Sequence, residues 1–383
     1  MRLLYLTADP GVPVLGHKGA SVHVRELATA LRRLGVKVAI ASPRTEPGGN
    51  VLDPRIQLLE IPRVVPAGSE LELRTALEAQ RATVLELARD FQAEAIYERY
   101  SLFSDAGVNA AAALGVPHVL EVNAPLRREA QDFRTLPQPA LAVELELAVF
   151  RGSGRLIAVS SALAKWLEAQ GVEPERVEVV PNAVAPERFG PRPERNDGVF
   201  VVGFCGSLKA WHGIEVLLEA CEAAFAEEPS LRLEIVGSGP LEHLLSEAAL
   251  PAERLVAHGP VPHAEAIEYL RGWDVGLAPY LPLDDFYFSP LKVLEYMAAG
   301  LCPVASSLGD IPALLGQGER GVLVPAGDSG ELAAALVALA RNRRRAAELG
   351  RRARSYVREA HTWERNARVV LDALRAQPRE LAA

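Results

Sequence analysis

The sequence predicts two α/β domains, each built on a doubly wound parallel sheet with helices on both faces. The chain has 383 residues, more than one hydrophobic core usually supports. Short apolar runs alternate with longer amphipathic runs from the N-terminus onward, which is typical of parallel sheets. A charged segment with several prolines, residues 186–198, interrupts this alternation before it starts again. We therefore expect a Rossmann-like domain over residues 1–185, a linker over 186–198, and a second domain from residue 199 that faces the first across a cleft.

The first domain is expected to contain strands at residues 3–7, 36–41, 55–61, 95–97, 117–122, 156–159 and 177–180. Helices are expected at residues 20–34, ended by Gly35, and at residues 71–90. A loop with Gly16 and Gly19 lies between the first strand and the first helix, where open α/β sheets bind ligands. Its spacing differs from the dinucleotide fingerprint, so an NAD-dependent dehydrogenase is not favoured.

The second domain is expected to contain strands at residues 199–205, 231–236, 255–257, 275–278, 303–305 and 321–324. A helix is expected at residues 214–225, and the last segment, residues 331–376, is expected to be helical. That last segment holds a cluster of seven arginines: Arg341, Arg343, Arg344, Arg345, Arg351, Arg352 and Arg354. Such a cluster can bind nucleic acid or anionic lipid. The interleaved Ala, Leu and Glu residues favour a solvated helix face instead.

The composition is that of an ordinary globular protein. The formal net charge of −8 argues against a general nucleic-acid binder. The three cysteines, Cys205, Cys221 and Cys302, have no metal-ligand spacing and indicate a reducing compartment. The N-terminal apolar run is too short for a secretory signal, and no run is long enough to span a membrane. We expect a cytoplasmic protein.

The stretch Phe-Tyr-Phe-Ser-Pro-Leu-Lys, residues 286–292, predicts a loop that leads into a helix. Ser289 suits the N-cap, Pro290 the first helical position, and Gly300 the end of the helix. Backbone N–H groups at such a helix start attract anions. Lys292 and Glu295 are three residues apart and share one face, so they can hold a phosphate and a hydroxylated ring together. The alternative is an exposed helical ion pair without a ligand.

The loop at residues 206–213 lies between a strand and a helix. Gly206 allows close approach of the backbone to a ligand, and Lys209 offers a charge for phosphate. His212 offers a donor, or a positive charge if its pKa is raised. The alternatives are a solvent-facing lysine and a helix-capping histidine.

Polar residues follow other buried strands. Asn123 lies just after the strand at 117–122, in a segment that fits either a site or a turn. Asp284 and Asp285 can accept hydrogen bonds from sugar hydroxyls, or form a polar loop tip. The chain has no Asp-x-Asp triplet, so no metal ion or other cofactor is expected.

Two motifs together resemble the family 4 glycosyltransferases, which are retaining enzymes of the GT-B architecture. One is Ser-Pro-Leu-Lys-x-x-Glu-Tyr-Met-Ala-x-Gly at residues 289–300, and the other is Gly-Ser-Leu-Lys-x-Trp-His-Gly at residues 206–213. The segments Pro-Asn-Ala-Val at 181–184 and Gly-Ser-Gly-Pro at 237–240 support the match. The resemblance covers nearly the full length.

The resemblance implies roles for individual residues in binding a nucleotide sugar. Glu295 would bind the ribose hydroxyls, and the backbone near Phe288, Ser289, Pro290 and Leu291 would face the donor sugar and diphosphate. Gly16 and Gly19 would approach the diphosphate and the acceptor. Gly237 and Gly239 would lie under the nucleoside, with Val261 near the base. The nucleotide-sugar domain would cover residues 199–355, and a last helix within 356–383 would cross back to the N-terminal domain.

Three positions depart from the family pattern. Tyr287 stands where the first glutamate of the E-x7-E motif is expected, so Asp284 or Asp285 is a substitute candidate. Ser207 and His212 stand where the family has phosphate-binding Arg and Lys. We therefore expect Lys209 and Lys292 to carry that charge and to act as catalytic groups, together with Asn123, which replaces a histidine.

The resemblance implies transfer of a sugar from a nucleotide sugar to a hydroxyl acceptor, without a metal ion. The acceptor is expected to be a small molecule, a saccharide or a lipid-linked group, with possible peripheral membrane contact and no nucleic acid. Two alternatives stay open: a sugar-nucleotide epimerase on the same fold, and a nucleotide-sugar-binding protein without catalysis.

Overall fold

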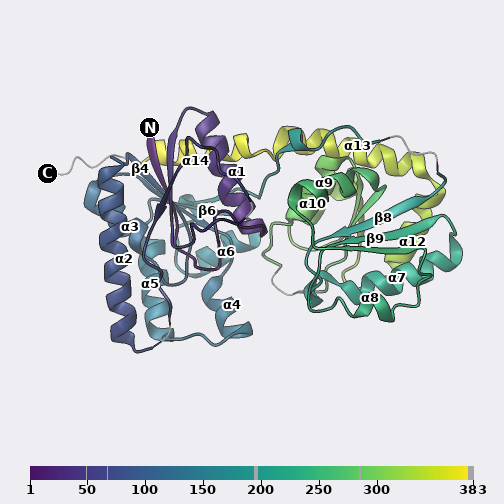
Figure 1. The fold of residues 1–383 in the computed structure, drawn as a ribbon, viewed down its shortest axis with the longest axis horizontal. Helices are drawn as coiled ribbons and strands as arrows, with labels where there is room; N and C mark the ends of the chain where they lie inside the picture. The colour runs from purple at the N-terminus through teal and green to yellow at the C-terminus, as the bar shows by residue number, and fades with distance from the viewer. Residues whose placement is uncertain (49, 67, 194–196, 284–285, 378–383) are drawn as a thin grey trace. The chain divides into compact units, whose positions relative to one another are not determined.

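The structure is a computed structural model that describes residues 1–48, 50–66, 68–193, 197–283 and 286–377. Its chain forms two compact α/β units, in agreement with the predicted fold class (Figure 1). Unit 1 comprises Met1–Asn182 and Trp363–Ala383, and unit 2 comprises Ala183–Thr362. The first crossing between the units therefore follows residue 182 rather than 185. The second precedes residue 363 rather than 356.

The sheet of unit 1 is parallel throughout. Its order is β3 (Gln57–Glu60), β2 (Lys37–Ser42), β1 (Arg2–Thr7), β4 (Ala95–Arg99), β5 (His118–Val122), β6 (Arg155–Ala158) and β7 (Val177–Val179). The strand order reverses between β1 and β4. Such a switch point opens a crevice at the carboxyl ends of the strands, where ligands bind.

Helices cover both faces of this sheet. They are α1 (Gly19–Arg33), α2 (Glu70–Asp90), α3 (Ala106–Leu114), α4 (Leu126–Phe133), α5 (Pro139–Gly152), α6 (Ser161–Ala169) and α14 (Trp363–Arg375), with a 3-10 turn η1 (Pro174–Arg176). Leu4 and Leu6 of β1 pack with α2 and α3 on one face. Helices α1 and α14 pack together, against β2 and β5 respectively, so the C-terminal helix belongs to unit 1.

Unit 2 repeats the arrangement. Its parallel sheet has the order β10 (Leu255–Gly259), β9 (Leu231–Val236), β8 (Phe200–Cys205), β11 (Val275–Ala278), β12 (Cys302–Ser306) and β13 (Val322–Val324). The switch point here lies between β8 and β11. Its helices are α7 (Ile214–Glu227), α8 (Leu244–Glu247), α9 (His263–Gly272), α10 (Leu291–Ala299), α11 (Ile311–Leu314), α12 (Ser329–Arg341) and α13 (Arg343–Ala360), with 3-10 turns η2 (Pro186–Arg188), η3 (Ala210–His212) and η4 (Gly316–Gly318).

Alternation along β8 divides the core of unit 2 into two layers. Phe200, Val202 and Phe204 face α7 and α12, whereas Val201 faces the layer formed by α9, α10 and α13. This is the period-two pattern of a strand buried on both faces. Cys221 and Cys302 are buried in the first layer, and Cys205, Cys221 and Cys302 are free thiols.

The segment at 331–376 is helical, as predicted, and consists of three helices, because the Asn342 side chain caps α13 and the chain turns again before Trp363. The predicted linker is wrong in extent. Within the predicted linker, Phe189 is buried in the core of unit 2, and Arg354 donates a hydrogen bond to its carbonyl at 2.6 Å. The start of the predicted linker is therefore part of unit 2.

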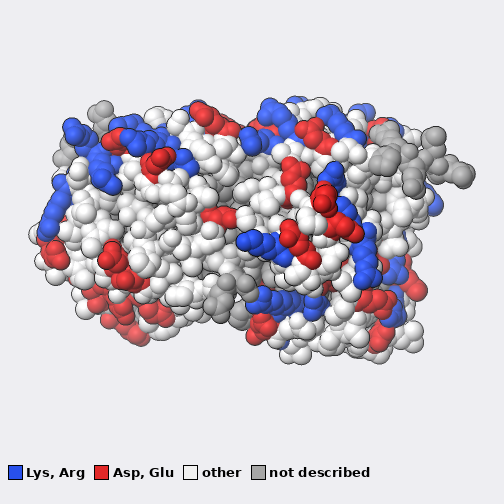
Figure 2. All heavy atoms as spheres, turned by 180° about the vertical axis from the view of Figure 1, so that it is seen from behind, with Lys and Arg blue, Asp and Glu red and all other residues white. Residues whose placement is uncertain are grey.

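The arginine cluster of α12 and α13 is partly engaged in protein contacts. Arg341 pairs with Glu227 and Glu228, and Arg352 pairs with Glu348 on its own helix. Basic and acidic atoms are interspersed over the face seen in Figure 2. These contacts support the predicted solvated face. In the described ranges, no helix is both long and apolar enough to cross a membrane.

Candidate functional site

The carboxyl edge of the unit 2 sheet gathers most of the predicted donor-site residues. The loop after β8 contains Gly206, Ser207, Lys209 and His212, and the chain after β11 leads into α10. These two strands flank the switch point, so their loops open into the same crevice.

The loops after β8 and β9 approach each other closely because glycine stands at the contacts. Gly206 donates its N–H to the Val236 carbonyl at 2.9 Å. A Cβ on Gly237, which has φ 132°, would lie 2.0 Å from the Gly206 oxygen. A Cβ on Gly239 would lie 2.6 Å from the Leu208 oxygen. Both glycines are therefore required by loop packing, and their predicted place under a nucleoside stays a prediction.

Helix α10 begins one residue later than predicted. Pro290, not Ser289, is the N-cap residue, and no side chain caps the helix, which begins at Leu291. The Pro290 ψ of 84° is not helical, so the proline precedes the first turn. The N–H groups at this start thus lack a side-chain acceptor, which suits an anion. Gly300 ends the helix with φ 77°, as expected.

Lys292 carries a buried ammonium group at this helix start. In the described part of the chain its Nζ has no hydrogen-bond partner, and it lies 4.2 Å from the centroid of the Phe204 ring and 5.3 Å from that of Tyr280. A Cβ on Gly206 would lie 3.3 Å from this Nζ, so Lys292 faces the loop after β8. Burial lowers the pKa of Lys292 to about 7, although Cys205 and Glu295 partly oppose the shift.

Glu295 is paired with a residue that the sequence did not single out. His263 Nε2 lies 2.7 Å from Glu295 Oε1, with both side chains about a quarter exposed (26% and 21%). The alternative of an exposed ion pair between Lys292 and Glu295 is therefore wrong. Only the position of His263 directly after Val261 and Pro262, near the expected base, hinted at a role.

His212 is neutral, contrary to one of the two roles expected for it. Its Nδ1 donates a hydrogen bond to the Ser207 carbonyl at 2.5 Å. Burial, together with the charges of Lys292 and Lys209, lowers the pKa of His212 to about 4. It is not the helix cap, which is Gly213. Lys209 lies with its Nζ 4.6 Å from the centroid of the exposed Trp211 ring.

Aromatic rings hold the segment before α10. Phe288 is half-buried and packs on Phe286 and Tyr287, with ring centroids 5.5 and 4.4 Å away. Val261 is also half-buried, against the layer that contains α9 and α10. Asp284 and Asp285 lie outside the described residues.

In unit 1 the glycine loop is held by a residue that the sequence did not reveal. Arg25 of α1 donates from one nitrogen to the carbonyls of Val14 and Gly16, at 2.6 and 2.7 Å. Gly16 is buried, and a Cβ there would lie 2.6 Å from Pro13 Cγ. Gly19 is the first residue of α1 and is exposed, so it does not belong to the loop as predicted.

Asn123 follows β5 at the carboxyl edge of the unit 1 sheet. Its Oδ1 and Nδ2 are buried, and neither has a hydrogen-bond partner among the described residues. A buried amide without partners is costly and calls for a ligand or a water molecule. Its expected role in the site therefore stays a prediction.

Glu121, two residues before Asn123, is held by contacts with other side chains of unit 1. Its Oε1 lies 2.7 Å from His23 Nε2, and Arg99 lies 3.6 Å from its other oxygen. Burial alone would raise the pKa of Glu121, but His23 and Arg99 outweigh it and lower that pKa. The other nitrogen of His23 lies 2.9 Å from Asn182, and its ring packs edge-on against Trp363. This cluster therefore joins the two segments where the chain leaves and re-enters unit 1.

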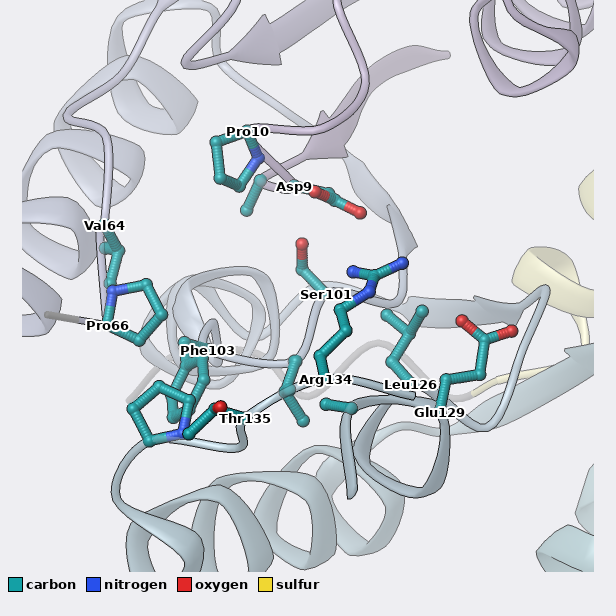
Figure 3. A pocket seen from close by; sticks show the side chains of 14 residues that line it. Asp9, Pro10, Val64, Pro66, Ser101, Phe103, Leu126, Glu129, Arg134 and Thr135 are labelled. Atoms are coloured by element: carbon teal, nitrogen blue, oxygen red, sulfur yellow. The ribbon is translucent and has the colours of Figure 1, made fainter. Parts of the chain in front are cut away.

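A cavity of about 240 Å³ opens at the unit 1 switch point (Figure 3). Residues just after β1 and just after β4 line it, among them Asp9 and Ser101. Figure 3 shows Arg134 extending toward Ser101, with Phe103 on the other wall. Apolar residues form much of the lining: Pro10, Val64, Pro66, Leu102, Leu126 and Pro137. Sequence reasoning missed this cavity, because its residues come from five separate segments.

Comparison with known protein families matches both units. Residues 17–188 match the family described as Glycosyltransferase Family 4, and residues 199–342 match Glycosyl transferases group 1. A phosphatidyl-myo-inositol mannosyltransferase from Mycobacterium leprae is 30% identical over 344 residues, which are 85% of this chain and 84% of that protein. A D-inositol 3-phosphate glycosyltransferase from Paenarthrobacter aurescens is 26% identical over 96% of this chain and 94% of its own.

Solved structures show the same fold at lower identity. A sucrose-phosphate synthase from Thermosynechococcus elongatus superposes with a TM-score of 0.76 at 21% identity, covering 98% of both chains. The Anabaena protein HepE, solved in complex with UDP and glucose, superposes with a TM-score of 0.73 at 18% identity, covering 98% of this chain and all of that one.

Proposed function

The chain belongs to the family 4 glycosyltransferases, and from this premise we propose that it transfers a sugar, with retention, from a nucleotide-sugar donor to a hydroxyl acceptor. The observation that carries the proposal is the buried Lys292 ammonium beside the uncapped start of α10. An ammonium and helical N–H groups together match the charge of a diphosphate. The complex of HepE with UDP and glucose supports this donor class.

The donor is assigned to unit 2. The diphosphate is placed at the start of α10, within reach of Lys292, and the ribose beside Glu295. Gly206 lies beside the Lys292 ammonium, since a Cβ on it would be 3.3 Å from that Nζ, and Ser207 follows it in the loop after β8. His212 fixes the loop through its hydrogen bond to the Ser207 carbonyl. It adds no positive charge, because it is neutral.

The acceptor is assigned to the cavity of unit 1. Its lining combines apolar walls with Asp9, Ser101 and Arg134, which suits a hydroxylated ring with one apolar face. The names of the two curated relatives point to inositol-based acceptors, either phosphorylated or lipid-linked. An acceptor of that polyol class is therefore the first to test.

The proposed reaction breaks the bond between the anomeric carbon and the diphosphate oxygen. A bond forms between that carbon and the acceptor oxygen on the same face of the sugar, and the acceptor proton passes to the leaving phosphate. Lys292 stabilises the charge on the departing diphosphate, as preorganised electrostatic groups do. No metal ion is needed in this scheme, since the lysine and the helix N-terminus supply the positive charge.

A donor panel tests the proposal. Nucleotide sugars that bind the folded protein raise its melting temperature. The best donor is then incubated with inositol-type and saccharide acceptors, and the anomeric configuration of the product is read by NMR. A glycoside with the donor's configuration supports the proposal. Inversion, or conversion of the donor to an isomeric nucleotide sugar without acceptor, contradicts it.

A further inference from the structure

We propose that His263 is a positioning residue that orients the Glu295 carboxylate toward the ribose of the donor. The inference rests on the proposed function, because it assumes that Glu295 meets a nucleotide. The role of His263 follows from the three-dimensional contact between α9 and α10.

The geometry fixes the direction of the hydrogen bond. A carboxylate only accepts, so the Nε2 of His263, at 2.7 Å, carries the hydrogen and donates it to Glu295 Oε1. His263 is the first residue of α9, and Glu295 lies in the second turn of α10, so the bond joins two packed helices. In the described part of the chain, His263 is the sole hydrogen-bond partner of the Glu295 side chain.

This arrangement leaves one carboxylate oxygen for a ligand. With Oε1 held by His263, rotation of the carboxylate is restricted and Oε2 keeps a single orientation. A partner that fixes a binding group in this way lowers the ordering cost of binding. The same bond also holds the negative charge of Glu295 one turn from Lys292, which bears the diphosphate in the proposed function.

A second histidine–carboxylate pair in unit 2 provides a matched control. His258 Nε2 lies 3.3 Å from Glu234 Oε2, and the two side chains are 19% and 18% exposed. The His258 ring packs on Tyr269, with the ring centroids 4.1 Å apart. Glu234 also accepts a hydrogen bond from Trp273 Nε1 at 2.9 Å. That pair stabilises the packing of β9, β10 and α9 and contains none of the proposed donor-site residues.

The test is calorimetric binding of a nucleoside diphosphate and of its 2′,3′-dideoxy analogue to the full-length protein. We expect His263→Phe, which keeps a ring but lacks the donor, to weaken nucleoside diphosphate binding about tenfold. The preference for the ribose over the dideoxyribose should shrink in parallel. His263→Gln retains an N–H donor and should restore most of both effects, whereas His258→Phe should bind both ligands like the wild type.

Unchanged binding by His263→Phe would overturn the inference, as would an equal loss for both ligands. An equal loss in His258→Phe would also overturn it, because the effect would then be one of general stability. The readout is binding alone. A wild-type protein that binds the nucleotide but transfers no sugar would therefore contradict the proposed function and still test His263.

Discussion

The ammonium nitrogen of Lys292 lies 4.2 Å from the centroid of the Phe204 ring, buried and without a hydrogen-bond partner in the described chain. A cation–π contact compensates only part of the cost of burying a charge. An anion bound beside this ammonium would stabilise its charge. The burial of Lys292 is the basis of the next three predictions, on kcat, proton uptake and the pH dependence of stability.

Replacing Lys292 by methionine should lower kcat about 10²–10³-fold, because one group that stabilises the leaving diphosphate is lost. The free energy of unfolding should stay equal or rise, since an apolar side chain replaces a buried charge. Steady-state kinetics and urea unfolding measure the two effects. Lys165→Met, at an exposed lysine of α6, serves as the control and should change neither. A kcat equal to that of the wild type would exclude Lys292 from the chemistry.

Binding of a nucleoside diphosphate should take up protons at pH 8. With a pKa of about 7, roughly nine-tenths of Lys292 is neutral there, and a bound diphosphate favours the charged form. Calorimetry in buffers of different ionisation enthalpy measures this uptake, which Lys292→Met should abolish. Proton uptake that persists in the variant would assign it to another group.

The same shift predicts how stability depends on pH without ligand. The pKa of Lys292 is lower in the folded than in the unfolded chain, so the unfolded chain binds more protons between the two values. The contribution of Lys292 to stability should therefore rise as the pH increases from about 7 to about 10. Urea unfolding across this range, compared with Lys292→Met, isolates that contribution. A flat difference between the two proteins would contradict it.

Gly237→Ala should destabilise the protein strongly and impair donor binding. Its new Cβ would collide with the Gly206 carbonyl and separate the two loops of the donor site. Gly259→Ala, at φ 69° with no atom within 4 Å of its Cβ, should cost only the ~1–2 kcal/mol of a left-handed backbone. Equal melting temperatures for the two variants would show that the loop contact does not matter.

Arg134→Gln should raise the acceptor KM about tenfold, as expected for a lost charged hydrogen bond, and leave the donor KM unchanged. The control is Arg128→Gln on α4, where the arginine pairs with Asp132 at 3.4 Å and does not line the cavity. If the donor KM changed and the acceptor KM did not, the acceptor would not bind in this cavity.

Each strand in the described residues overlaps a run expected from the sequence, and the clearest are continuous apolar runs such as residues 275–278, which are buried on both faces. The helices α3 to α6 and α9 were not predicted. Of these, α5 does bury Leu141, Leu145 and Val149 at helical spacing, so its period of 3.6 was present in the sequence and was missed. The predicted site residues Gly206, Lys292 and Glu295 do meet at one sheet edge.

Residues whose role depends on contacts across the fold could not be predicted. His263 lies 32 positions from Glu295 in the sequence, and no spacing rule joins them. Likewise, burial decides the protonation of His212 and Lys292, and the sequence does not state burial. The cavity with Asp9, Ser101 and Arg134 arises only when strands far apart in the chain become neighbours.

The most direct measurement is a crystal structure of the enzyme with a nucleoside diphosphate sugar. We expect its diphosphate at the N-terminus of α10, in contact with the Lys292 ammonium and with the N–H groups of Leu291 and Lys292. A diphosphate bound elsewhere, with the Lys292 ammonium still buried against Phe204 and without a ligand, would contradict the account.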